Sequence, residues 1–151
     1  MDGYAQLIEK ELREGLRAYF SVPDLYEYGV ACVEEKLQES MMFSRMTVLH
    51  YRAFGGLGNG IYRAAAAVEL MILSLDIIDD LQDKDNKEMV WNRMSPDIAL
   101  NIAIGLLTLS QQMLLTSEFT QDRLSGAVRL MNEQVLGAIN GQTTDLLNNI
   151  K

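Results

Sequence analysis

Apolar residues recur every three or four positions along almost the whole chain, a spacing that places them on one face of a helix. In the first segment Leu7, Leu12 and Leu16 follow this spacing, and prolines, which interrupt helices, occur only at Pro23 and Pro96. The pattern therefore predicts an all-α protein, with helices over about residues 4–19, 23–39, 43–54, 61–83, 95–115 and 120–151.

The segment Gly55–Gly60 interrupts this pattern, because four of its six residues are glycines. No strand precedes the segment and no Gly-Lys-Ser/Thr sequence follows it, so it fits neither a phosphate-binding loop nor a dinucleotide fingerprint. A connection between two helices is favoured. No repeat, low-complexity stretch or linker occurs, and we predict one domain over residues 1–151.

The composition narrows the class of protein and its partners. Hydrophobic residues make up 48% of the chain, which argues against disorder, and a net charge of −8 without a lysine or arginine cluster argues against a nucleic-acid partner. Cys32 stands alone, so no disulfide framework is expected and a reduced, cytoplasmic setting is the default. The polar N-terminus is not a secretory signal, and the longest apolar run, Ile98–Leu109, is too short to span a bilayer.

Residues 76–85 carry five aspartates directly after the apolar stretch Ala64–Leu75. Unpaired carboxylates in a low-dielectric interior cost several kcal/mol each, so stability does not explain this placement. At about 100° per residue, four of the aspartates fall within an arc of roughly 100°, namely Asp76, Asp79, Asp80 and Asp83. The helix therefore shows one acidic stripe, which we interpret as facing magnesium that carries a diphosphate.

Magnesium is the cation that suits this stripe best. It takes oxygen ligands in octahedral geometry and is usually held by one or two carboxylates together with substrate phosphates. Asp79 and Asp83, four residues apart, can present such a pair from successive turns of a helix. A calcium-binding EF-hand is excluded, because the glycine and glutamate that its loop requires are missing. The alternative is a solvated helix end, since residues 84–88 have the composition of an exposed loop.

A second polar group lies near the C-terminus. Gln142 and Asp145 are three residues apart and share a helix face, and Gly137 and Gly141 allow another helix to approach closely. Alone, these residues indicate packing and a polar helix end, and they gain weight only when they are paired with the aspartates. The lone Trp91 is interpreted as an aromatic plug over the acidic loop, without a catalytic role.

Together these motifs resemble the trans-isoprenyl diphosphate synthases, a family of all-helical enzymes. Asp79–Asp83 reads as DDxxD, the first aspartate-rich motif of that family, Ala67–Met71 is similar to its A-x-E-L-I segment, and Gly141–Leu146 is similar to its GQxxDL motif. Within the family, Asp76–Asn86 followed by Trp91 most resembles the ComQ isoprenyltransferases, which modify a tryptophan of a competence-pheromone precursor. The resemblance implies a helical bundle of the isoprenoid synthase type.

The resemblance also implies a set of ligands and a reaction. Asp79 and Asp83 would hold magnesium ions, with Asp80 and Asp76 as supporting ligands or as groups that hold the ligands in place. The metal would grip the diphosphate of an allylic donor such as farnesyl or geranyl diphosphate. After ionisation of the donor, the indole of a peptide tryptophan would attack the allylic cation. Asp79, Asp80 and Asp83 are therefore the expected catalytic residues of an isoprenyltransferase.

Residues outside the stripe complete the expected substrate site. The resemblance implies that Gln142 and Asp145 line the substrate cavity. Leu75, four residues before the motif, stands where short-chain synthases often place an aromatic floor. The candidate cations for the diphosphate are Arg45, Lys84, Lys87 and Arg93.

The chain also departs from the family. Chain-elongating synthases bind isopentenyl diphosphate through a GGKxxRP segment and an Arg-Arg pair after DDxxD. Here residues 41–46 keep only Arg45, and residues 84–89 contain no arginine pair. Because each missing cation removes a charge-assisted contact to a second diphosphate, the pattern favours a peptide acceptor. An ordinary synthase, a non-catalytic helical module and a bundle whose stripe pairs with a basic partner are the alternatives.

The family continues well beyond the length of this chain and supplies a second aspartate-rich motif from a later helix. No such motif occurs among these 151 residues, so the resemblance covers only the N-terminal half of the family fold. We expect a fragment or a truncated relative, with weak or no turnover on its own. The oligomeric state, including a homodimer, stays open.

Overall fold

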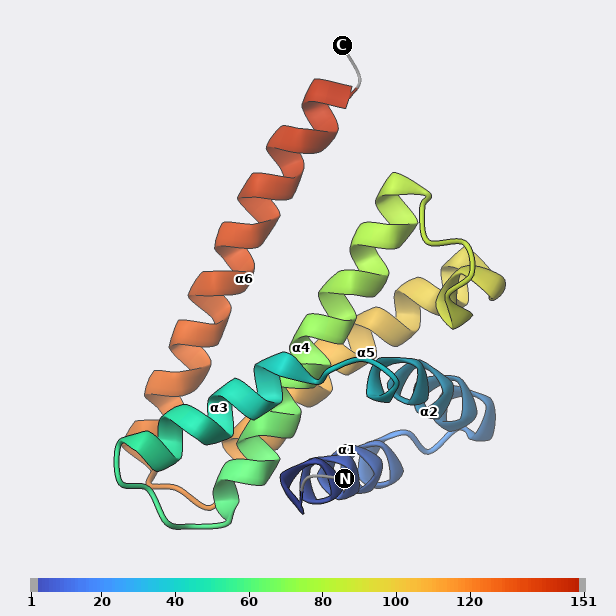
Figure 1. Ribbon diagram of the computed structural model, residues 1–151. Coiled ribbons are helices and arrows are strands. Elements are labelled where there is room, and N and C mark those ends of the chain that lie inside the picture. The colour runs from blue at the N-terminus through green and yellow to red at the C-terminus, as the bar shows by residue number, and fades with distance from the viewer. Residues whose placement is uncertain (1–2, 150–151) are drawn as a thin grey trace. The chain divides into compact units, whose positions relative to one another are not determined.

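The computed structural model describes residues 3–149, which form six α-helices and one short 3-10 helix, without a strand among them (Figure 1). The elements are α1 Gly3–Tyr19, α2 Pro23–Leu37, α3 Met42–Ala53, α4 Gly60–Asp83, η1 Val90–Arg93, α5 Pro96–Leu115 and α6 Gln121–Asn149. The all-α prediction is confirmed, and the predicted helix limits agree with these bounds to a residue or two. The predicted end of the last helix, at residues 150–151, lies outside the described residues. The short helix η1 between α4 and α5 was not predicted.

The chain divides into two compact units, Met1–Glu118 and Phe119–Lys151. The first unit contains α1 to α5 together with η1, and the second contains α6. The position of one unit relative to the other is not determined. That the whole chain forms one domain therefore stays a prediction.

α4 is the central helix of the first unit. It packs most extensively against α5 and also contacts α1 and α3. The run Ala64–Ala67 is buried, and its small side chains let neighbouring helices approach closely. Larger apolar side chains fill the space around this run and are buried, among them Leu70, Leu73 and Ile77 of α4, Ile8, Leu12 and Leu16 of α1, and Ile102, Leu106 and Met113 of α5. The helix that carries the acidic stripe is therefore embedded in the core.

Among the described residues, α5 is the one helix that is long and apolar enough to cross a membrane by length and composition alone. It has 20 residues and so extends beyond the apolar run Ile98–Leu109. The core helix of a protein passes the same test, and α5 buries Ala99, Ile102 and Leu106 completely while Ile104 is exposed. The length of α5 is therefore weak evidence for a membrane span.

Polar contacts hold both ends of α4. Before the helix, the guanidinium of Arg52 donates to the carbonyl oxygen of Gly56 at 2.9 Å, which shapes the glycine-rich connection from α3. After the helix, Lys84 adopts a left-handed conformation with φ 59°, and its N–H donates to the carbonyl oxygen of Asp80 at 2.9 Å. For this reason α4 ends at Asp83, directly after the acidic stripe.

Candidate functional site

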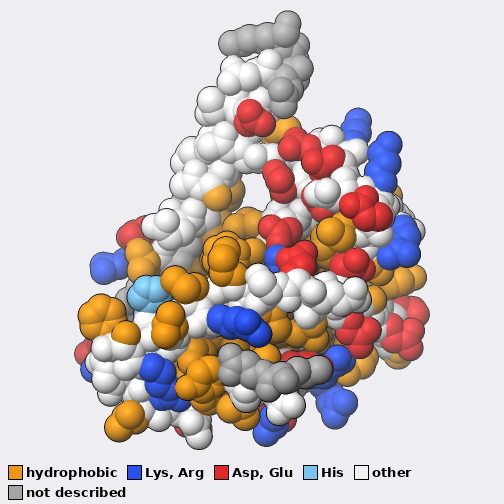
Figure 2. All heavy atoms as spheres, in the orientation of Figure 1, with side chains coloured by type: hydrophobic (Ala, Val, Ile, Leu, Met, Phe, Trp, Pro, Cys, Tyr) orange, Lys and Arg blue, Asp and Glu red, His pale blue; other side chains and the backbone are white. Residues whose placement is uncertain are grey.

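Acidic side chains gather on one face of the first unit, where α4 ends (Figure 2). Asp79 and Asp83 are exposed there, one helical turn apart, and Lys84 and Lys87 are exposed in the loop that follows. The last carbonyl groups of a helix carry a partial negative charge, which adds to the charge of the carboxylates. This end of α4 therefore attracts cations.

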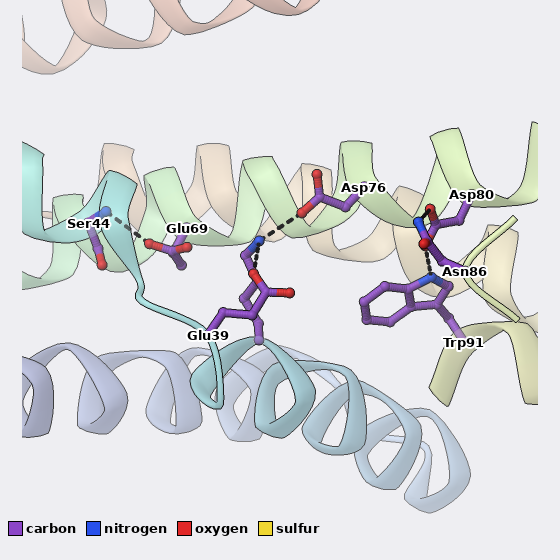
Figure 3. Close-up of polar contacts among 8 residues, drawn as sticks. Glu39, Ser44, Glu69, Asp76, Asp80, Asn86 and Trp91 are labelled. Atoms are coloured by element: carbon purple, nitrogen blue, oxygen red, sulfur yellow. Dashed lines mark hydrogen bonds and ion pairs between the residues drawn. The ribbon is translucent and has the colours of Figure 1, made fainter. Parts of the chain in front are cut away.

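Asp80 lies between these two exposed aspartates in the sequence, but its side chain is buried, with 5% of its surface exposed. Its Oδ1 accepts a hydrogen bond from Nδ2 of Asn86 at 2.6 Å, and its Oδ2 accepts one from Nε1 of Trp91 at 2.7 Å (Figure 3). Trp91 is itself buried in η1. The carboxylate is therefore engaged by the segment between α4 and α5.

Helix geometry explains why the aspartates of one stripe have different surroundings. Relative to Asp76, Asp80 is rotated by about 40° towards the side of Leu73 and Ile77, whereas Asp79 is rotated by about 60° in the opposite direction. Leu73 and Ile77 are buried. The stripe therefore follows the boundary between the buried and exposed faces of α4, with Asp80 on its inner edge and Asp79 on its outer edge.

Asp76 is paired with a cation from another helix. The ammonium of Lys36 in α2 donates to Oδ2 of Asp76 at 2.8 Å and to Oε2 of Glu39 at 2.8 Å (Figure 3). Burial lowers the pKa of Lys36, but the hydrogen bonds to the two carboxylates outweigh this effect, and the net pKa is raised. Lys36 is therefore a permanent cation beside the acidic stripe at neutral pH.

The loop after α4 adds a further carboxylate to the same region. Partial desolvation, repulsion by Asp80 and a side-chain hydrogen bond with it, and weaker repulsion by Asp83 raise the pKa of Asp85. The part of this shift that comes from repulsion means that the neighbouring carboxylates disfavour one more negative charge. A divalent cation at this end of α4 would relieve that repulsion.

Magnesium suits the donor set at this end of α4. Within residues 3–149, no three or more His, Cys, Asp or Glu side chains are grouped so that they could hold a metal ion by themselves. A closed cage is not required, because magnesium usually takes one or two carboxylates and completes its shell with water and substrate phosphates. Asp79 and Asp83 are exposed carboxylates on successive turns of α4, and each offers oxygen atoms to a cation. The residues present therefore fit a magnesium ion held by Asp79 and Asp83.

The structure gives the exposure or a neighbour of each remaining candidate of the first unit. Leu75 is half-buried on α4, and Arg45 is exposed in the first turn of α3. Nη2 of Arg93 in η1 lies 3.8 Å from Oε2 of Glu35 in α2, so this candidate cation already has an acidic neighbour. Roles in substrate binding stay predictions for Arg45, Leu75, Lys84, Lys87 and Arg93.

Gln142 and Asp145 lie on α6, which forms the second unit. Asp145 is exposed and Gln142 is half-buried. The hydroxyl of Thr143 between them donates to the carbonyl oxygen of Ile139 at 2.7 Å, which is ordinary for a threonine within a helix. That this pair lines one cavity with the aspartates stays a prediction, since the two units are not placed relative to each other.

The contacts of two buried charged residues, Lys36 and Glu69, were not predicted from the sequence. Lys36 follows Gly29, Cys32 and Val33 at a spacing that places all four on the buried face of α2. A lysine in such a row needs a buried partner, and this signal could have identified it. Glu69 is 2% exposed, and its Oε2 accepts a hydrogen bond from the backbone N–H of Ser44 at 2.9 Å (Figure 3).

Comparison with known proteins points to one group. No family model and no solved structure matches the chain. The chain is 37% identical over 108 residues to "Tryptophan prenyltransferase ComQ" of Bacillus subtilis subsp. natto (strain BEST195), a stretch that covers 71% of this chain and 34% of the relative. It is 36% identical over 126 residues to the protein of that name from Bacillus spizizenii, a stretch that covers 83% of this chain and 43% of the relative. It is 34% identical over 129 residues to the protein of that name from Bacillus subtilis (strain 168), a stretch that covers 85% of this chain and 41% of the relative.

These matches include the acidic part of α4. Any stretch of 108 residues within a chain of 151 contains residues 44–108, because it starts no later than residue 44 and ends no earlier than residue 108. Asp79, Asp83 and Trp91 therefore lie inside the similar region. The matched stretches cover 34% to 43% of the curated relatives, so the chain spans well under two thirds of their length.

Proposed function

We propose that this chain, which is related to the ComQ tryptophan prenyltransferases over most of its length, forms the part of such an enzyme that binds an isoprenyl diphosphate donor through magnesium. The enzyme would transfer the allylic isoprenyl group, farnesyl or geranyl, to a tryptophan of a peptide. One observation carries the proposal: Asp79 and Asp83 stand exposed on successive turns of a core helix, inside the region similar to ComQ.

Asp79 and Asp83 are the proposed ligands. Their carboxylates supply the hard oxygen donors that magnesium prefers, and their exposure leaves room for the phosphate oxygens of a substrate. Magnesium bound there would neutralise the leaving diphosphate and so favour ionisation of the allylic C–O bond. Lys84 and Lys87, exposed in the next loop, are proposed to contact the diphosphate with their ammonium groups.

The acceptor is proposed to be an indole rather than a second diphosphate. The printed name of the relatives, tryptophan prenyltransferase, supports this choice. The loop Lys84–Met89 contains no arginine pair that could hold the diphosphate of isopentenyl diphosphate. Leu75, half-buried one turn before Asp79, is proposed to contact the isoprenyl chain on the apolar side of the site. There it would help to exclude water from the allylic cation.

Calorimetry tests the donor site directly. The full chain is titrated with farnesyl thiodiphosphate, an unreactive donor analogue, with and without magnesium. We expect binding that requires magnesium and that weakens by about 10-fold or more in Asp79→Ala and in Asp83→Ala, because each change removes a ligand. Asp97→Ala is the matched control, since Asp97 is an exposed aspartate at the start of α5, and it should bind as the wild type does.

The outcomes separate the alternatives. Binding that does not depend on magnesium, or that survives Asp79→Ala unchanged, would support a non-catalytic module and contradict the proposal. Association with basic proteins that weakens with salt and needs no metal would support an acidic docking face instead.

Mass spectrometry tests the acceptor. A tryptophan peptide is incubated with magnesium, farnesyl or geranyl diphosphate and the chain in excess over the donor, so that slow transfer is also detected. We expect the mass of one isoprenyl group to be added at the tryptophan and not to a peptide in which phenylalanine replaces it. Labelled isopentenyl diphosphate is offered in parallel, and elongated labelled diphosphates would contradict the peptide acceptor.

A further inference from the structure

Asp80 is bound at three points by the segment that follows α4. Its two carboxylate oxygens accept hydrogen bonds from the side chains of Asn86 and Trp91, at 2.6 and 2.7 Å. Its backbone carbonyl oxygen accepts one from the N–H of Lys84 at 2.9 Å. Hydrogen bonds to a charged carboxylate are stronger than those between neutral groups. The side chain and the backbone of one buried residue therefore fasten the segment 84–91 to the last turns of the helix.

The segment has a conformation that needs such a fastening. Lys84 and Asn86 both have positive φ angles, 59° and 45°, which side chains other than glycine rarely adopt. On the other side of the segment, Nδ2 of Asn92 donates to the carbonyl oxygens of Asp85 and Asn86, both at 2.9 Å. The path of the chain after α4 is thus held from the helix by Asp80 and from η1 by Asn92.

The last turn of α4 depends on this path more than the preceding turns do. The last turn of a helix lacks onward hydrogen bonds from its carbonyl groups and frays readily. Asp83 is the final residue of α4, directly before Lys84, whereas Asp79 lies one turn deeper in the helix. The spacing between the two exposed carboxylates is therefore set by whether the turn that carries Asp83 stays helical.

We propose that Asp80, Asn86 and Trp91 form a polar anchor that holds the last turn of α4 in place, and that Asp80 serves the site as a positioning residue and not as a magnesium ligand. The anchor acts through Asp83, whose carboxylate it keeps one turn from that of Asp79. The anchor itself stands on the contacts above, and its effect on magnesium rests on the proposed function.

The fluorescence of Trp91 tests the anchor without any ligand. Trp91 is the single tryptophan of the chain, so its emission reports on this contact alone. In the metal-free chain we expect Asp80→Asn and Asn86→Ala to shift the emission to longer wavelength and to increase quenching by acrylamide. Asp83→Asn, the same chemical change three residues later on the exposed side, should leave both unchanged. Far-UV circular dichroism identifies any variant that fails to fold, and Asp80→Asn and Asn86→Ala change the contact from opposite sides.

Magnesium affinity tests whether the anchor positions Asp83. Calorimetry with magnesium and inorganic diphosphate should show binding about 10-fold weaker in Asn86→Ala, as for other residues that orient metal ligands. In the Asp83→Asn background, adding Asn86→Ala should cause no further loss, because the residue through which the anchor acts is already changed. A purely structural role of the anchor would instead give additive losses.

Each result decides one part of the proposal. Unchanged Trp91 emission in both Asp80→Asn and Asn86→Ala would overturn the anchor. A shifted emission with additive losses of magnesium affinity would overturn the positioning role of Asp80. A shifted emission in a chain whose wild type binds no magnesium with diphosphate would overturn the proposed function and the positioning role together, and would leave the anchor standing.

Discussion

The ammonium of Lys36 lies 2.8 Å from the carboxylate of Asp76, forty residues later in the chain. The same ammonium lies 2.8 Å from the carboxylate of Glu39, so one cation with 9% of its surface exposed joins two acidic side chains. The contact fastens α2 to the half of α4 that carries the acidic stripe. Asp76 is therefore neutralised from within the fold, while Asp79 and Asp83 face solvent.

Replacing Lys36 by methionine keeps an unbranched side chain of similar length but removes the charge and both hydrogen bonds. We expect the free energy of unfolding to fall by about 1–3 kcal/mol, since hydrogen bonds to charged groups contribute about that much and Asp76 loses its cation. Urea unfolding at neutral pH measures the change. Lys10→Met is the matched control: Lys10 lies 3.8 Å from Glu14 on an exposed helix surface. Its effect should stay below about 0.5 kcal/mol.

The pKa of Lys36 predicts how this contribution varies with pH. Burial lowers the pKa of Lys36, but its hydrogen bonds to Asp76 and Glu39 prevail and raise it above the ordinary value of 10.5. A group whose pKa is raised on folding stabilises the fold fully below its unfolded pKa and loses that effect as the pH rises through its folded pKa. The difference between wild type and Lys36→Met should therefore be constant between about pH 7 and about pH 9, and shrink only above the unfolded value. A difference that already disappears below pH 9 would contradict this assignment.

The helices could be predicted from the sequence because their signal is local. An apolar side chain every three or four residues marks a buried face wherever it packs, so the limits of α1 to α6 followed from the periodicity, the two prolines and the glycine-rich segment. The contacts that shape the candidate site are not local. Lys36 and Asp76 are forty residues apart, and Glu69 and Ser44 are 25 apart, so no spacing in the sequence connects them.

The acidic stripe shows in more detail what could not be predicted from the sequence. Helix geometry placed four aspartates in one arc, but it does not tell where the boundary of the buried face falls within that arc. Contacts with other segments fix this boundary: Leu73 and Ile77 are buried on the side of Asp80, and the indole of Trp91 reaches Asp80, whereas Asp79 is exposed. The sequence could therefore suggest the stripe, but not the different surroundings of its members.

Cys32 offers a test of how firmly α2 is packed in the core. It is completely buried, and this desolvation raises the pKa of its thiol to about 12. With such a pKa, only about one thiol in 10⁴ is ionised at pH 8, and the thiolate is the reactive form. We expect a chromogenic disulfide reagent to label the native chain at least about 100-fold more slowly than the chain in concentrated urea. Rapid labelling under native conditions would show that α2 opens without global unfolding.

Glu69, on α4, accepts a hydrogen bond from a backbone N–H in the first turn of α3. Met41, which precedes α3, has φ 47° and provides no side-chain cap, while Oε2 of Glu69 accepts the N–H of Ser44. The other oxygen of Glu69 has no hydrogen-bond partner among the described residues. We expect Glu69→Leu to be less stable than Glu69→Gln by about 1–3 kcal/mol, because leucine leaves the buried N–H of Ser44 unpaired and glutamine retains an acceptor. Thermal or urea unfolding of the two variants measures this difference. Equal stability would mean that the hydrogen bond to Ser44 contributes little.

Gly60 begins α4 at a point where the backbone of another segment passes close by. A Cβ at this position would lie 2.9 Å from Cβ of Glu118 and 3.0 and 3.1 Å from its backbone nitrogen and oxygen. Backbone atoms cannot rotate away as the end of a long side chain can, so Gly60→Ala must displace either the start of α4 or the segment around Glu118. We expect a loss of about 1–3 kcal/mol in the free energy of unfolding, as for other overpacked positions.

Gly3 supplies the matched control for Gly60, since it is the first residue of α1 and nothing lies within 4 Å of a Cβ built there. In open space an alanine only restricts the unfolded chain and favours the helix, so Gly3→Ala should be neutral or stabilising by up to about 1 kcal/mol. The two variants make the same chemical change at the same position of a helix, and the opposite signs isolate the contact with Glu118. If Gly60→Ala is as stable as Gly3→Ala, the segment around Glu118 yields freely, and the contact with Glu118 does not fix the start of α4.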